Sequence, residues 1–252
     1  EKKTEDASKS SVITMLMREA KKIIFIRLGS SSYVTDLDIF SSMINLLSKP
    51  VILVTTDGDR DVPSSYNSIT VNKILNSDKI SKWYTQNYDG TVQHDKLFHI
   101  PIGFDLHTKK WWINDSYAGK LRYMVETRIK SLSKIRNVDK IFCDGHLTIS
   151  HKERKEMYNI IKDCSHIDFA SSHKSFQEIT NLYNNYRFAI SPRGTGIDCH
   201  RTWELFLAGT IVITKTSPLD DMYINNNLPV VIIKDWTDLL DNIEEKMVDW
   251  IE

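Results

Sequence analysis

The residues best suited to chemistry lie in one stretch, residues 188–214, which reads FAISPRGTGIDCHRTWELFLAGTIVIT. A turn of sequence PRGTG follows a short apolar run, and a helix is expected to open near Asp198. Glycines let backbone N–H groups approach a ligand closely, and an arginine and the positive end of a helix dipole both favour an anion. The pattern predicts a nucleotide-diphosphate site whose turn residues are Arg193, Gly194, Thr195 and Gly196.

The expected helix adds two polar side chains to this site. Residues three and four apart share a helix face, and those predicted to form the buried stripe are Cys199, Trp203, Phe206 and Leu207. On the flank, Arg201 could clamp a phosphate, and Glu204 could accept hydrogen bonds from two ribose hydroxyls. The alternative is an exposed Arg201–Glu204 pair that contributes a few tenths of a kcal/mol. Beside the Arg-Gly turn, the ligand interpretation is favoured.

The C-terminal part of the chain also carries a family signature. The run SPRGTGIDCHRTWELFLAGTIVIT, followed by SPLDDMY and LPVVIIKDW, extends over roughly the last seventy residues. It resembles the C-terminal signature of the exostosin-like glycosyltransferases, which have the two-domain GT-B fold. The resemblance implies that Arg193 and Arg201 face the diphosphate of a sugar nucleotide and that Glu204 faces its ribose. His146 could approach the donor phosphates, although its loop lacks the arginine that the family often has there.

Composition narrows the class of protein. Among 252 residues, Lys plus Arg and Asp plus Glu both number 33, so nothing favours nucleic acid as a partner. No apolar run approaches the length of a membrane span. The three cysteines show no paired or metal-ligand spacing, so free thiols in the cytoplasm are favoured. A lumenal Golgi domain whose N-terminal anchor has been removed is the alternative, because the polar start resembles a trimmed leader.

The order of apolar runs predicts an α/β protein of GT-B-like architecture. Strand, helix and strand alternate in both halves, which is typical of parallel, Rossmann-like sheets. The expected organisation is two such domains facing a cleft. Its segments are a disordered or truncated leader over 1–20, an acceptor-side domain over 21–115, a linking helix over 116–139 and a nucleotide-sugar-binding domain over 140–252.

The acceptor side of the site is expected in the first half. Asp105 and His107 follow the predicted strand 97–102, and ligands of α/β sheets lie at the carboxyl ends of strands. Either side chain could take a proton from the acceptor hydroxyl, and the sequence does not choose between them. Equally, both could have only structural roles. Trp111 and Trp112 could stack on a sugar ring, with Asp57 also expected at the acceptor.

Three functions remain in competition. The favoured one is a glycosyltransferase, inverting and metal-independent, that moves a sugar from a nucleotide-diphosphate donor, a UDP-sugar above all, to a glycan hydroxyl. A metal-dependent transferase using Asp57 and Asp59 is the runner-up, because Asp-x-Asp after a strand can hold a divalent ion. The third is a non-catalytic glycan- or nucleotide-binding module. A nicotinamide-dependent oxidoreductase is disfavoured, because no G-x-G-x-x-G follows the first strand.

Overall fold

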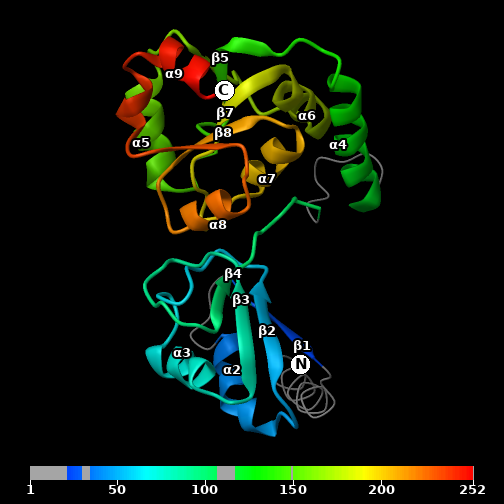
Figure 1. Ribbon diagram of the computed structural model, residues 1–252, viewed down its shortest axis with the longest axis vertical. Helices are drawn as coiled ribbons and strands as arrows, with labels where there is room; N and C mark the ends of the chain where they lie inside the picture. Colours follow the sequence, from blue (N-terminus) through cyan, green and yellow to red (C-terminus); the bar gives the residue numbers. More distant parts are fainter. Residues whose placement is uncertain (1–21, 30–34, 107–116, 149, 252) are drawn as a thin grey trace. The chain divides into compact units, whose positions relative to one another are not determined.

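The computed structural model describes residues 22–29, 35–106, 117–148 and 150–251 (Figure 1). The chain divides into two compact units, Glu1–Ile102 and Gly103–Glu252. The expected leader, residues 1–20, lies outside the described part. In that part, no helix combines the length and the apolar composition needed to cross a membrane.

The first unit is a parallel sheet with helices packed on one face. Its elements are β1 (Ile23–Arg27), α2 (Asp36–Met43), the short 3-10 helix η1 (Ile44–Leu46), β2 (Val51–Thr56), α3 (Ser68–Leu75), β3 (Ile80–Thr85) and β4 (Leu97–His99). The strands lie in the order β1-β2-β3-β4, and all three pairings are parallel. Apolar residues of α2 and α3 form a single core cluster with one side of these strands.

Local sequence signals explain how these elements begin and pack. Thr35 caps α2 in a reciprocal capping box with Asp38, which satisfies two backbone donors at the helix start. At the sheet centre, Trp83 is fully buried, and its indole N–H donates to Thr55 at 2.8 Å. Burial alternates along β2, which places Leu53 against the helices and its two neighbours on the other side of the sheet.

The second unit is a five-stranded parallel sheet covered on both faces. Its strands are β5 (Asn137–Cys143), β6 (Ile167–Phe169), β7 (Tyr186–Ile190), β8 (Ile211–Lys215) and β9 (Val230–Ile233). Its helices are α4 (Tyr117–Ser131), α5 (Lys152–Ile161), α6 (Phe176–Asn185), α7 (His200–Leu207), α8 (Asp220–Asn225), the 3-10 helix η3 (Trp236–Leu239) and α9 (Ile243–Asp249). The strand order is β6-β5-β7-β8-β9.

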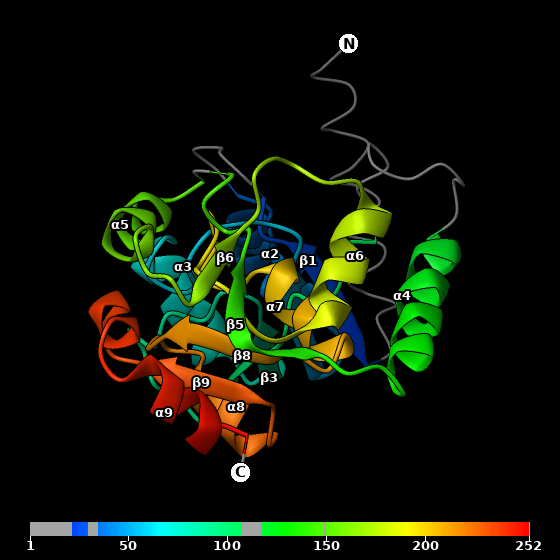
Figure 2. The ribbon, with the colours of Figure 1, turned by 90° about the horizontal axis from the view of Figure 1, so that it is seen from above.

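This strand order places a topological switch at the centre of the sheet. From β5 the chain goes to β6 on one side and then returns to β7 on the other. Accordingly, α5 and α9 share a core cluster on one face, whereas α6 and α7 pack on the opposite face (Figure 2). Ligands of such sheets bind where the order reverses, at the carboxyl ends of the strands. Rossmann-like α/β architecture with parallel sheets is thus confirmed in both halves.

The basic helix α4 is part of the second unit and packs against α6 and α7. Ser131 at its end donates to the side chain of Asn184 in α6 at 2.8 Å. Just beyond the helix, Arg136 donates to backbone carbonyls at the end of α6 and to Thr210 before β8. These hydrogen bonds anchor a segment that the sequence pattern assigned to a linker between domains.

Candidate functional site

The loops after β5 and β7 pack directly against each other at the switch point. A Cβ added to Gly145, after β5, would lie 2.7 Å from the ring carbons of Pro192, after β7. Contacts below about 3.0 Å do not occur without rearrangement, so the close approach of these loops requires glycine at position 145. The two loops thereby form one wall of the site.

A buried ion pair joins the β5 loop to helix α7. The Nε of Arg201 lies 2.7 Å from Oδ1 of Asp144, with side-chain exposures of 14% and 11%. The other carboxylate oxygen of Asp144 accepts a hydrogen bond from the hydroxyl of Tyr183 at 3.0 Å. Burial lowers the pKa of the Arg201 guanidinium, but the interactions with Asp144, Tyr183 and Cys199 together outweigh burial, so this pKa is raised. Arg201 is therefore a fixed cation at the switch point and does not form an exposed pair with Glu204.

A second buried arginine, Arg154 on α5, supports the turn after β7. Its Nε donates to the carbonyl of Arg193 at 2.8 Å, and its Nη1 donates to the carbonyl of Thr148 at 3.0 Å. Its Nη2 lies 3.5 Å from the sulfur of Cys199. Burial lowers the pKa of Arg154, and the nearby charge of Arg201 lowers it further. The positively charged guanidinium groups of Arg154 and Arg201 therefore lie near each other. This arrangement favours an anionic ligand between them.

These groups line a cavity of about 480 Å³ at the carboxyl end of the sheet. Its charged walls come from the segment before α4, from α4 itself, from the β5 loop, from α5 and from α7. The residues that carry these charges are Asp105, Lys120, Asp144, Arg154, Arg201 and Glu204, with Lys174 from the segment before α6. Phe176 and Ile179 of α6 add apolar surface. The volume suits a ligand of nucleotide size, and the mixed lining can bind both an anionic group and hydroxyls.

Glu204 lies in this cavity next to Asp105 and Lys120. Lys120 is 7% exposed; its ammonium donates to the Asp105 carbonyl and lies 3.5 Å from the Asp105 carboxylate. Burial raises the pKa of Glu204 to about 7, and the Asp105 carboxylate acts in the same direction. Lys120, Arg201 and a hydrogen bond from the Asp105 backbone act against this rise. Near neutral pH, Glu204 can therefore exist in either protonation state.

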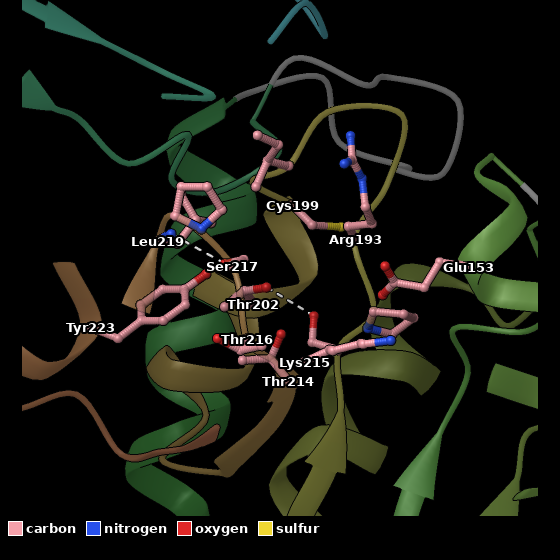
Figure 3. Close-up of a pocket in the computed structure, with 14 residues that line it drawn as sticks. Glu153, Arg193, Cys199, Thr202, Thr214, Lys215, Thr216, Ser217, Leu219 and Tyr223 are labelled. Carbon is pink, nitrogen blue, oxygen red and sulfur yellow. Dashed lines mark hydrogen bonds between the residues drawn. The ribbon is translucent and has the colours of Figure 1, made fainter. Parts of the chain in front are cut away.

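A smaller pocket of about 150 Å³ is lined by the turn after β7, the start of α7 and the segment at the end of β8 (Figure 3). Thr202, Thr214, Thr216 and Ser217 lie between Tyr223 on one side and Glu153 on the other. Thr202 shares a 2.8 Å hydrogen bond with the buried hydroxyl of Ser191. Cys199 lines both this pocket and the larger cavity, so the two adjoin at the start of α7.

The structure places the predicted turn residues around these pockets, but in different roles. Arg193 lines the smaller pocket, and its Nη2 donates to the carbonyl of Thr195 at 3.2 Å. Gly194 and Gly196 are buried, whereas Thr195 is exposed. A Cβ on Gly194 would approach Arg154 at 3.5 Å, an ordinary contact, so this position does not require glycine.

The predicted face of helix α7 is partly wrong. The helix begins at His200, close to the predicted start near Asp198, but its fully buried side chains are those of Thr202 and Leu205. Trp203 and Phe206 are only partly buried, in a separate cluster with Tyr223. The reason is that the helix packs its more polar side toward the sheet. There Asp144 forms an ion pair with Arg201, and Ser191 after β7 shares a hydrogen bond with Thr202.

His146 contributes to an aromatic cluster. Its ring stacks on Tyr158 at a centroid distance of 5.0 Å and meets Phe169 edge-on. Burial lowers its pKa, so the ring is neutral at pH 7. Among the described residues, the lining of the two pockets does not include His146.

The other predicted residues lie outside the cavity or outside the described part. His107, Trp111 and Trp112 fall in the undescribed segment 107–116. Asp57 belongs to the first unit, where its carboxylate lies 2.6 Å from the Nε of Arg27. Within the described ranges, no three His, Cys, Asp or Glu side chains converge as a metal site.

Sequence reasoning missed Lys120, Arg154 and the anchoring role of Asp144. Lys120 and Arg154 each sit in helices rich in exposed lysine and arginine, so no local pattern distinguishes them.

Comparison of the chain with models of known protein families gives no match. A search of curated protein sequences gives no significant match either.

The raised pKa of Glu204 predicts a pH dependence of stability. Between the usual pKa of 4.5 and about 7, the folded state holds a proton that the unfolded state releases. The free energy of unfolding should therefore fall as pH rises through this window, by up to about 1.4 kcal/mol per pH unit. Urea unfolding at several pH values should show a smaller slope in Glu204→Gln. The exposed Glu156→Gln is the control, and an unchanged slope in Glu204→Gln contradicts the assignment.

The contact between the two switch-point loops predicts a difference between two glycines. Gly145→Ala should lower the free energy of unfolding by about 1–3 kcal/mol, because its Cβ would overlap the Pro192 ring. Gly194→Ala is the matched control and should be nearly neutral. Urea denaturation measures both, and equal destabilisation by the two substitutions would show that the loops do not pack as described.

Proposed function

We propose that the chain is a glycosyltransferase of GT-B architecture that transfers a sugar from a nucleotide-diphosphate donor to a hydroxyl of a glycan acceptor. The observation that carries the proposal is the pair of buried guanidinium groups of Arg154 and Arg201 facing one cavity with the carboxyl group of Glu204. Fixed cations suit a diphosphate leaving group, and a carboxylate suits vicinal hydroxyls of a ribose. Their position at the switch point supports the same interpretation.

The adjoining pockets support a ligand with two parts. Both pockets carry charged side chains, the smaller one adds several hydroxyl groups, and Cys199 borders both. A sugar nucleotide joins hydroxyl-rich neutral ends through an anionic diphosphate, and two adjoining pockets of this polarity suit such a ligand. The resemblance of the sequence around Arg193 and Arg201 to exostosin-like enzymes favours a UDP-sugar as donor.

In the proposed reaction, the acceptor oxygen attacks the anomeric carbon of the donor sugar and its bond to the diphosphate breaks. Arg201 and Arg154 would stabilise the negative charge that develops on the leaving group. The carboxylate of Asp105, which lines the same cavity, would accept the proton of the acceptor hydroxyl. This route inverts the configuration at the anomeric carbon, because a single displacement occurs.

Nucleotide binding tests the proposal directly. UDP at one hundred times its dissociation constant should stabilise the protein by about 2.7 kcal/mol, measured as a rise in melting temperature. In the same assay 2′-deoxy-UDP should give a smaller shift, since it lacks one hydroxyl for Glu204. Glu204→Ala should reduce the shift with UDP and remove the difference between the two ligands.

The control for this experiment is Lys155→Ala on the exposed side of α5, which should bind both nucleotides like the wild type. No shift with any nucleoside diphosphate would contradict the proposal. A different result would indicate a non-catalytic binding module. In that case nucleotides bind, no sugar donor releases nucleoside diphosphate, and Asp105→Ala leaves binding unchanged.

Metal chelation separates the proposed mechanism from the metal-dependent alternative. Release of nucleoside diphosphate from the sugar donor should persist in EDTA, because the guanidinium groups supply the positive charge. Asp59→Asn should leave the rate unchanged. Loss of turnover in EDTA, recovery with Mn²⁺ and loss in Asp59→Asn would together transfer the assignment to Asp57 and Asp59.

A further inference from the structure

The outer side of helix α4 and the turn after it expose a group of large aliphatic side chains. The exposed fractions are 38% for Val125, 60% for Ile129, 64% for Leu132 and 101% for Ile135; we call this group the outer patch. Its first three members follow the i, i+4, i+7 spacing of one helix face. α4 lies outside α6 at the edge of the second unit (Figures 1 and 2). Isolated apolar residues are common on surfaces, whereas several large ones together mark an interaction surface.

Hydrogen bonds on the inner side hold this region in place. Ser131 at the end of α4 is 3% exposed, and its hydroxyl donates to the side chain of Asn184 in α6 at 2.8 Å. Arg136 donates to acceptors at the end of α6 and before β8. Leu132 and Ile135 lie between these two anchors along the chain. The fold therefore holds both side chains in solvent, and they do not belong to a frayed helix end.

Positive charge accompanies the outer patch. From residue 117 to residue 136 the chain has one acidic residue, Glu126, and its basic residues are Lys120, Arg122, Arg128, Lys130, Lys134 and Arg136. Of these, Arg122, Lys130 and Lys134 are exposed; we call them the flanking cations. The remaining basic residues contact other parts of the second unit. The exposed surface therefore combines bulky aliphatic groups with a positive net charge.

We infer that the outer patch and the flanking cations bind the surface of a membrane that contains anionic lipids. Such a bilayer presents negative headgroups directly above hydrocarbon, so it complements both parts of the surface. A side chain as exposed as Ile135 projects from its surroundings, and a fluid lipid layer accommodates such a projection. A partner helix is instead bound in an apolar groove, which a projecting side chain does not form. This inference concerns the second unit alone and stands whether or not the chain transfers sugars.

The inferred binding is peripheral. α4 has 15 residues, which span about 22 Å, less than the roughly 30 Å of bilayer hydrocarbon. Its inner side packs on α6 and α7, so the outer patch is the part of this helix that can enter lipid. Attachment therefore depends on the aliphatic groups and the cations together, and it weakens as salt screens the charges.

Co-sedimentation of the full chain with lipid vesicles tests this inference. The wild type should pellet with vesicles of phosphatidylcholine and phosphatidylserine and stay in solution with phosphatidylcholine alone. Ile135→Asp should weaken binding by about tenfold or more, because a carboxylate replaces an aliphatic group buried in lipid. Lys130→Gln and Lys134→Gln should each weaken binding by about fivefold at low salt, because each removes one charge near the surface. The melting temperatures of these variants should stay near the wild-type value, because the side chains are exposed.

Matched controls separate the outer patch from a general effect of charge. Ile69→Asp makes the same change at another exposed isoleucine, on α3. Lys155→Gln removes an exposed lysine of α5. Both variants should bind anionic vesicles like the wild type.

Several results would overturn the inference. These are no binding to anionic vesicles at low salt, full binding by Ile135→Asp, or an equal loss of binding in Ile135→Asp and Ile69→Asp. A second copy of the chain on the outer patch would give a concentration-dependent dimer that Ile135→Asp dissociates, with no vesicle binding. If another part of the chain covers the patch, Ile135→Asp lowers the melting temperature and the wild type does not pellet with vesicles.

Discussion

The ion pair between Arg201 and Asp144 is the interaction on which the rest of the site depends. Removing both charges from water is unfavourable, and the pair persists because its geometry is close and Tyr183 satisfies the second carboxylate oxygen. The pair fixes the start of α7 against the loop after β5, at the place where the strand order reverses. Both partners of this contact line the cavity.

The charge of the cavity depends on the ion-pair and hydrogen-bond partners of Arg201 and Arg154. Arg201 has a carboxylate partner, whereas the N–H groups of Arg154 donate to the carbonyl oxygens of Arg193 and Thr148 and to the sulfur of Cys199. Hydrogen bonds to neutral acceptors orient a guanidinium without neutralising it. Arg154 thus holds the turn after β7 in place and keeps its positive charge available. One buried residue supports the loop and also favours an anionic ligand.

Glu204 shows how the fold sets the protonation of a single side chain. Helix α7 carries it into a partly buried position beside the Asp105–Lys120 pair, which reaches it from α4 and the segment before α4. Burial and a like charge raise its pKa, and two cations limit the rise. A carboxyl group poised near pH 7 can accept or donate hydrogen bonds, so its role changes within the physiological range.

The sequence by itself predicted the parallel α/β layers, and it singled out the segment 188–214, part of which borders the candidate cavity. Apolar strand runs, capping residues such as Thr35 and the polar turn at Arg193 are local signals, and they encode elements that form from neighbouring residues. Only the tertiary structure determined which charged side chains form ion pairs. Arg201 pairs with Asp144, 57 positions earlier in the chain, rather than with nearby Glu204. Lys120 and Arg154 are buried among exposed basic residues of the same type. Burial and partner choice depend on contacts between distant segments, and linear spacing does not record those contacts.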